Sequence, residues 1–351
     1  MRTTPASLTT IARAVDDRLA ALLEAETARW GNGGKRLRPA FCYWGFVGSG
    51  GDARSTSVID AGGALELLHA FALFHDDVMD GSTTRRGEPT THTVFIEEHH
   101  KGSLAGEARR YGEGVAILVG DLAFVYADLL MKGASPEAWA MWNELRVELN
   151  FGQYLDMVGS ATSERRREKA ERICRYKSGK YTIERPAERI CRYKSGKYTI
   201  ERPLHLGALL ANPTCGDGHL AALSRYGLPL GDAFQMRDDV LGAFGETQVT
   251  GKPVGDDLRE GKPTPLMAIA VSRANASQKK ILDLVGSVSL SDAQVEQVQD
   301  VIRDTGALDE LEAHISALTD EAIAALGKAD LTEESKNELV ALANYVSWRV
   351  V

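Results

Sequence analysis

The sequence lacks the features that mark secreted, membrane-spanning and nucleic-acid-binding proteins. Its 4 cysteines include no Cys-x-x-Cys pair, which argues against a disulfide framework and a cysteine-based zinc site. No apolar run reaches the ~18 residues of a membrane span, and the N-terminus has no signal-peptide core. The net charge of −8 argues against a nucleic-acid partner. We therefore expect a reduced, cytoplasmic protein without a transmembrane segment.

Alternating strand patterns are also missing, and helical periodicity dominates the chain. No internal boundary interrupts it, so we expect one all-α domain spanning residues 1–351, with 44% hydrophobic residues to build its core. Residues 97–100 (Glu-Glu-His-His) lack the spacing of a helical His pair and are expected in a solvated loop. The expected helices span residues 8–28, 40–47, 58–74, 115–130, 137–158, 220–244, 281–288, 295–302, 308–326 and 336–346.

Two of these apolar helices end in acids. The helix from residue 58 leads into Asp76, Asp77 and Asp80, and the helix from residue 220 leads into Asp238 and Asp239. Asp76 and Asp80 stand one helical turn apart and share a face. Carboxylates crowded at a buried helix end repel one another unless a cation lies between them, and oxygen ligands without Cys or His suit Mg²⁺. The alternative is a frayed helix end carrying ordinary surface acids.

Basic residues accompany both acidic helices, at Lys35, Arg38, Arg85, Arg86, Lys252 and Lys262. A diphosphate bound together with Mg²⁺ accounts for both signs of charge, since the metal bridges carboxylates to phosphate oxygens and Arg or Lys binds the remaining oxygens. The pattern therefore predicts ionisation of a diphosphate ester, with Mg²⁺ stabilising the leaving group.

These motifs resemble those of the trans-isoprenyl diphosphate synthases, and most closely the bacterial geranylgeranyl diphosphate synthases. The matching strings, in order, are GKRLRP at 34–39, ELLHAF at 66–71, DDVMD at 76–80, RRG at 85–87, GQYLD at 152–156, a Lys-Ser pair, FQMRDD at 234–239 and GKPVGDDLREGK at 251–262. The resemblance implies a helical bundle of the isoprenoid-synthase type around a deep cavity, and a homodimer formed through central helices.

The resemblance also assigns roles to residues. Asp76 and Asp80 would bind two Mg²⁺ ions and Asp238 a third, with Asp77 and Asp239 as supports behind them. The allylic diphosphate would be bound by the Lys-Ser pair and by Gln235, Arg85, Lys252 and Lys262. Isopentenyl diphosphate would be bound without metal by Lys35, Arg38, His69 and Arg86.

The implied reaction is head-to-tail condensation of isopentenyl diphosphate with an allylic diphosphate, with the released diphosphate as the base. Product length would depend on the small Ala72 and the bulky Phe71, which lies five residues before Asp76. Such an aromatic residue is typical of twenty-carbon synthases, so geranylgeranyl diphosphate is the expected product and farnesyl diphosphate the alternative. Phe71 could equally be an ordinary core residue.

The sequence departs from the family pattern at two places. Gly242 stands where the second acidic motif usually has a third Asp, so we expect weaker or altered metal binding there. Residues 170–186 also recur unchanged as residues 187–203, which doubles the Lys-Ser pair as Lys177-Ser178 and Lys194-Ser195. We expect Lys194 and Ser195 to occupy the site, because the second copy leads directly into the next helix and the first can then extend a loop at small entropic cost.

Two other functions remain open from the sequence. A class I terpene cyclase shares the acidic helices, Mg²⁺ and diphosphate, but it needs no isopentenyl site. An inactive subunit that modulates a partner synthase is the other, and Gly242 and the duplication favour it weakly.

Overall fold

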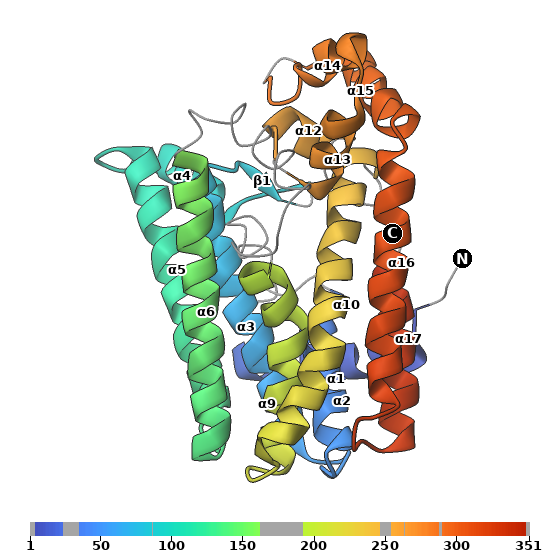
Figure 1. The fold of residues 1–351 in the computed structure, drawn as a ribbon. Helices are drawn as coiled ribbons and strands as arrows, with labels where there is room; N and C mark the ends of the chain where they lie inside the picture. The colour runs from blue at the N-terminus through green and yellow to red at the C-terminus, as the bar shows by residue number, and fades with distance from the viewer. Residues whose placement is uncertain are drawn as a thin grey trace.

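The computed structural model describes residues 4–23, 35–85, 87–161, 192–245, 254–262, 264–287 and 290–348. Across these residues the protein is a bundle of long helices, as expected, and the strands are limited to a two-residue antiparallel hairpin (Figure 1). The elements are α1 (Ala6–Leu23), α2 (Leu37–Gly48), α3 (Thr56–Asp80), β1 (Thr84–Arg85), β2 (Glu88–Pro89), α4 (Thr91–Lys101), α5 (Ala108–Leu130), α6 (Pro136–Ala161), the π-helix η4 (Arg192–Glu201), α9 (Arg202–Ala211), α10 (Gly216–Phe244), α12 (Asp256–Glu260), α13 (Pro265–Arg273), α14 (Ala276–Leu282), α15 (Asp292–Asp304), α16 (Ala307–Leu326) and α17 (Glu333–Ser347).

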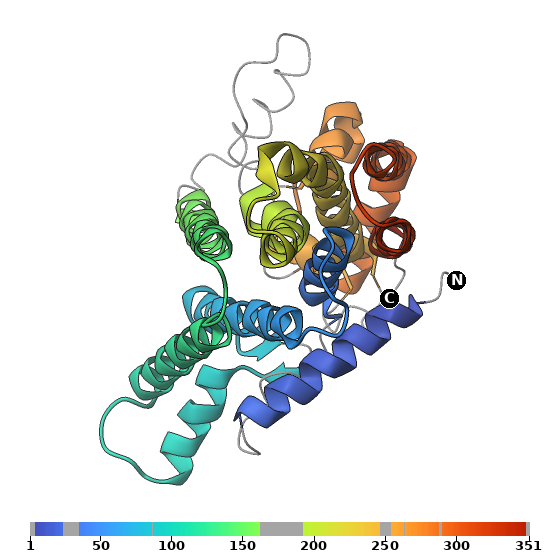
Figure 2. The same cartoon turned by 90° about the horizontal axis from the view of Figure 1, so that it is seen from below.

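Helix α3 carries the first acidic motif at its C-terminal end. Ser55 caps its first turn by accepting a hydrogen bond from the Ser57 amide, and Gly81 ends it in the left-handed conformation at φ 65°. It packs against α1, α2 and α5, and α1 crosses beside α2 and α3 in Figure 2. Within the described residues α3 is the one helix long and apolar enough to cross a membrane, but 56% of that apolar stretch is buried, as in the core helix of a soluble protein.

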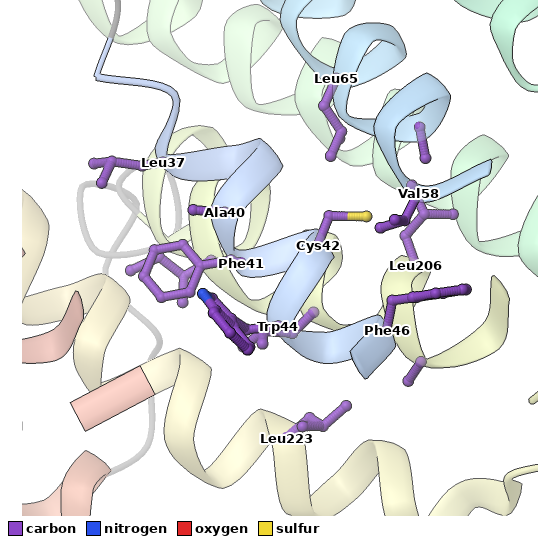
Figure 3. Close-up of a cluster of buried hydrophobic side chains, with 14 of the residues drawn as sticks. Leu37, Ala40, Phe41, Cys42, Trp44, Phe46, Val58, Leu65, Leu206 and Leu223 are labelled. Carbon is purple, nitrogen blue, oxygen red and sulfur yellow. The ribbon is translucent and has the colours of Figure 1, made fainter. Parts of the chain in front are cut away.

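The main core forms where α2 crosses α9. A Cβ on Gly207 would lie 1.9 Å from the Cys42 carbonyl oxygen, so only glycine permits this approach of the two backbones. Large side chains, including Phe41, Trp44 and Leu206, fill the space around the crossing (Figure 3). Burial of these side chains stabilises the bundle, since each Å² of apolar surface removed from water contributes roughly 25 cal/mol.

The two acidic helices end at the same end of the bundle. Helices α3 and α10 both run upward in Figure 1, so that their C-terminal ends lie near the hairpin and near α12 and α13. Beyond α10, a second apolar cluster joins its C-terminal half to α12, α13, α15 and α16. The site therefore lies where the loops and short helices gather, above a buried apolar floor.

The structure differs from the expected helices and loops at several places. Residues 97–100 belong to helix α4, with His99 buried: its ring lies 5.3 Å from that of Tyr111, and its Nε2 lies 3.3 Å from the Ala105 carbonyl oxygen. The helix expected over residues 8–28 begins two residues earlier, at Ala6, and residues 24–28 lie outside the described residues. Residues 256–260, which lie outside all the expected helices, form the short helix α12.

Candidate functional site

The acidic end of α3 has an inner and an outer set of carboxylates. Asp77 is buried, and Arg85 donates to its Oδ1 from Nε at 2.8 Å, with Nη2 at 2.6 Å. Burial outweighs that guanidinium and raises the pKa of Asp77. Asp76 is half-buried, and Asp80 is exposed at the last residue of the helix. Asp76 and Asp80 are therefore more accessible to a ligand than Asp77, and their roles as metal ligands and support stay predictions.

Two further side chains hold the outer carboxylate Asp76. Gln153 of α6 donates from Nε2 to Asp76 Oδ1 at 2.7 Å, across 77 positions of sequence. Arg85 Nη2 also lies 3.6 Å from Asp76 Oδ2. The guanidinium of Arg85, which is expected to bind a diphosphate, is therefore paired in this structure with Asp77 and lies close to Asp76, an expected metal ligand. Its neighbour Arg86 lies outside the described residues.

The acidic end of α10 repeats this arrangement. Asp239 is buried, and Gln235 donates to its Oδ1 at 3.0 Å. Burial, together with the nearby Asp257 and Asp238 carboxylates, raises the pKa of Asp239 to about 7. Asp238, one position earlier, is half-buried. Lys262 joins this group, with Nζ 2.7 Å from Asp257 Oδ1, whereas Lys252 lies outside the described residues.

A third group lies farther from the acidic end of α3 and combines Arg38 of α2 with His69 of α3 and Tyr198 of η4. The Arg38 guanidinium lies 4.4 Å from the centre of the Tyr198 ring, and the His69 ring lies 6.2 Å from the same ring. Among the described residues, three buried polar atoms here have no hydrogen-bond partner: Arg38 Nε, Tyr198 Oη and Glu66 Oε1, the last of which lies 3.9 Å from Arg38 Nη1. Buried polar atoms of this kind usually have partners, so the group points to a polar ligand. Lys35 is exposed just before α2.

Arg36 fixes the turn that carries Lys35 and Arg38. It adopts the left-handed conformation at φ 48°, which is uncommon for a residue with a side chain. Its guanidinium lies 2.5 Å from Glu66 Oε2 and 2.7 Å from Asp16 Oδ1, which joins the turn to α3 and α1. The two ion pairs offset the strain of a backbone held beside the site.

The second copy of the repeat forms η4 and leads into α9. Tyr198 and Ile200 are buried in the core, Lys197 Nζ lies 2.8 Å from Glu148 Oε1, and Arg202 Nε donates to Glu148 Oε2 at 2.7 Å. Lys194 and Ser195 lie in η4, where the structure describes their backbone only. Residues 170–186, with Lys177 and Ser178, lie outside the described residues. A π-helix is rare and is often found at a functional site.

The two residues expected to set product length lie one to two turns below the acids. Phe71 is half-buried, with its ring 4.8 Å from that of Phe124 on α5 and 4.7 Å from that of His75. Ala72 is half-buried beside it. The Phe71 ring thus lies between α3 and α5. In this position it could form the floor of a product pocket, or it could be an ordinary core residue.

Three residues of the site escaped the sequence reasoning: Arg36, Gln153 and Tyr198. Gln153 and Arg36 both belong to strings already singled out, GQYLD and GKRLRP, but periodicity within a helix does not reveal a contact with a distant one. In the sequence, Tyr198 has the character of an aromatic core residue. Its buried hydroxyl, which has no hydrogen-bond partner among the described residues, is the observation that links it to the site.

The residues present fit a magnesium ion. The outer groups of both helices offer carboxylate oxygens without Cys or His, and Mg²⁺ takes one or two carboxylates together with phosphate oxygens and water. Asp256, Asp257 and Glu260 on α12 also place one ligand atom each within 4.8 Å of one another. Acids at the C-terminal ends of α3 and α10, with basic side chains beside them, suit the diphosphate group of an ester. The apolar part of α3 that precedes the acids suits its hydrocarbon tail.

The chain is similar to known proteins in sequence and in fold. A family model described as polyprenyl synthetase matches residues 20–303. The geranylfarnesyl diphosphate synthase of Aeropyrum pernix is 32% identical over 91% of each chain. The geranylgeranyl diphosphate synthase of Mycobacterium tuberculosis is 32% identical over 83% of this chain and 76% of its own. The crystal structure of geranylgeranyl pyrophosphate synthase from Corynebacterium glutamicum, complexed with isoprenyl diphosphate and magnesium, superposes with a TM-score of 0.82 at 35% identity, covering 97% of this chain and 99% of that one.

Proposed function

Because the chain belongs to the polyprenyl synthetase family, we propose that it joins isopentenyl diphosphate to an allylic diphosphate by Mg²⁺-dependent head-to-tail condensation, with geranylgeranyl diphosphate as the product. The observation that carries this function is the pairing of two acid-ended helices, α3 and α10, with a separate basic group around Arg38. A terpene cyclase needs only the first of these features. An inactive subunit needs neither.

In this proposal the two diphosphates bind at different groups. Asp76, Asp80 and Asp238 would hold three Mg²⁺ ions, which neutralise the allylic diphosphate and stabilise it as a leaving group. Arg85, Lys194, Ser195, Gln235, Lys252 and Lys262 would bind its remaining oxygens. Lys35, Arg38, His69 and Arg86 would bind isopentenyl diphosphate, and the unpartnered atoms beside Tyr198 support a polar ligand there.

The condensation then moves one electron pair at a time. The allylic C1–O bond breaks and the diphosphate leaves with the bonding electrons. The isopentenyl double bond attacks the allylic cation at C1, a new carbon–carbon bond forms, and the proton next to the resulting cation passes to the released diphosphate. The chain's part is to orient both substrates and to exclude water, and the apolar residues of α3 below Asp76 suit that role.

The direct test of the proposed function is turnover. Purified protein with Mg²⁺, labelled isopentenyl diphosphate and dimethylallyl diphosphate should give labelled prenyl diphosphates up to twenty carbons, and a chelator should abolish them. Farnesyl diphosphate as the only product would replace the proposed chain length and keep the chemistry. Diphosphate release from a longer primer without elongation would favour a cyclase.

Phe71→Ala should lengthen the product. If the Phe71 ring closes the pocket against Phe124, removing it opens space below the growing chain, and products longer than twenty carbons should dominate when chain length is measured by chromatography. The opposite substitution, Ala72→Phe, should shorten the product. An unchanged product distribution in both variants would leave Phe71 as a core residue.

We also propose a cytoplasmic homodimer formed through α5 and α6. Large apolar side chains are exposed along both helices at helical spacing: Leu118, Leu122, Val125 and Leu129 on α5, and Val147, Phe151 and Tyr154 on α6. Between the two helices runs a groove of about 660 Å³ lined by Phe124, Asn143, Arg146, Val147, Asn150 and Phe151. An apolar stripe of this extent is typical of a surface covered by a partner.

Leu122→Glu combined with Val125→Glu should convert the dimer to a monomer. Two charges in the middle of the stripe would remain desolvated in the interface, which costs several kcal/mol. Light scattering during size-exclusion chromatography measures the change, and Arg110→Glu, an exposed position on the same helix, serves as the control. A wild-type monomer, or a double variant that stays dimeric, would contradict this surface.

A further inference from the structure

Gly242 and Asp257 occupy one space between α10 and α12. A Cβ built on Gly242 would lie 1.9 Å from Asp257 Oδ2 and 2.5 Å from Asp257 Cγ. Non-bonded atoms do not approach so closely, so any side chain at position 242 would displace the carboxylate of Asp257. Because position 242 of α10 is a glycine and not an aspartate, the Asp257 carboxylate of α12 can occupy this space.

The backbone of α12 fixes the Asp257 carboxylate in this place. The five-residue helix is bounded by Gly255 and Gly261, both in the left-handed conformation at φ 72° and 68°. Its Leu258 is buried in the apolar cluster that includes Val240 and Ala243 of α10. The Leu258 carbonyl also accepts a hydrogen bond from the Gly286 amide at 2.9 Å. Anchors on both sides of Asp257 thus hold α12 against the end of α10.

Position 242 is where a complete acidic motif would carry its third carboxylate. It lies four residues beyond Asp238, and residues at this spacing lie on one helix face. The carboxylate of Asp257 occupies the place that the first carbon of that side chain would take. It also lies close enough to Asp239 to interact with its charge, and its Oδ1 lies 2.7 Å from Lys262 Nζ.

We propose that Asp257 supplies, from α12, the third carboxylate of the second acidic motif, that Gly242 is the space it requires, and that Asp257 thereby positions Lys262 beside Asp239. The inference rests on the proposed function, because it assigns Asp257 and Lys262 to the diphosphate end of that site. Asp257 is a positioning residue: it completes the negative charge at the end of α10 and orients the ammonium group that binds a diphosphate oxygen. The Gly242 departure is thereby compensated within the fold.

Moving the carboxylate between the two helices tests the proposal. Four variants are compared with the wild type: Asp257→Ala, Gly242→Asp, the double variant Gly242→Asp with Asp257→Ala, and the control Gly218→Ala. Gly218 lies in α10 as well, but a Cβ there meets nothing within 4 Å. The first measurement is Mg²⁺-dependent binding of inorganic pyrophosphate by calorimetry, which needs no turnover. The second is kcat/KM for condensation.

Each single substitution at the pair should weaken pyrophosphate binding and lower kcat/KM by about tenfold to a hundredfold, as is usual when the partner of a metal site is removed. The double variant restores a carboxylate where the space has been freed, and it should recover to within about threefold of wild type, whereas independent effects would multiply. Gly218→Ala should behave as wild type.

Two results would overturn the proposal: Asp257→Ala binding pyrophosphate as the wild type does, or a double variant no better than Asp257→Ala. Thermal unfolding of each variant identifies any loss of fold. If Gly242→Asp does not fold, Asp257→Ala and the conservative Asp257→Asn decide the matter by the same binding measurement. A wild type that neither binds pyrophosphate nor condenses substrates would instead refute the proposed function itself.

Discussion

Replacing Asp76 with alanine should lower kcat/KM for condensation by about a thousandfold or more. The half-buried Asp76 carboxylate accepts a hydrogen bond from Gln153 and lies 3.6 Å from Arg85, so its loss removes a proposed metal ligand and leaves Gln153 without its carboxylate acceptor, while Arg85 remains paired with Asp77. Because the metal acts on the charge that develops as the allylic bond breaks, the loss should fall mainly on kcat.

Two controls separate this effect from a loss of fold. Asp300→Ala removes an exposed carboxylate from α15, where it pairs only at the surface with Arg303, and should leave the rate unchanged. The unfolding temperature of the Asp76 variant should remain near the wild-type value, while its Mg²⁺-dependent binding of pyrophosphate is lost. A rate within about tenfold of wild type would remove Asp76 from the metal site.

Lys194→Ala should lower kcat/KM by about a hundredfold to a thousandfold, and Lys177→Ala should have no effect. A lysine that binds a diphosphate oxygen contributes charge that strengthens as the leaving group forms. The assignment to the second copy is supported by its neighbours, because Lys197 and Arg202 of that copy bind Glu148 and Tyr198 lies in the core. A first copy seated in the same place would have to displace these contacts.

Deleting residues 170–186 is the matched experiment for the duplication. The deletion leaves a single copy with the same sequence and joins it to the preceding residue Lys169. Activity should be retained, because the remaining copy still leads into α9. Equal losses from Lys194→Ala and Lys177→Ala would sink the assignment, and so would a deletion variant that folds but does not condense.

The long helices are predictable from the sequence because their signals are local. Apolar runs and helical spacing anticipate α3, α5 and α10, and the comparisons support the all-α fold. Local signals fail for α4 and α12. The string from Glu97 to His100 is polar, and only packing against Tyr111 shows that His99 is buried. Helix α12 has five residues, too few to show a period.

The residues of the site also fall into those that local sequence signals predict and those that depend on packing between distant elements. The spacing of Asp76 and Asp80 follows from helix geometry alone, so their shared face is predictable. The bond from Gln153 to Asp76, the turn at Arg36 and the carboxylate of Asp257 over Gly242 depend on where separate elements meet. Gly242 shows the difference most clearly. The sequence shows only that position 242 lacks an aspartate, whereas the structure shows that the Asp257 carboxylate occupies the space beside it.

The fate of each diphosphate tests the central claim most directly. The allylic substrate and isopentenyl diphosphate are each labelled with ³²P in turn, incubated with protein and Mg²⁺, and the label is divided between pyrophosphate and prenyl product. In the first condensation, head-to-tail chemistry predicts that all allylic label appears as pyrophosphate while isopentenyl label stays on the lengthened product; in each later condensation the diphosphate of the previous isopentenyl unit is released in turn. Allylic label released without elongation, or isopentenyl label appearing as pyrophosphate in the first condensation, would contradict the account.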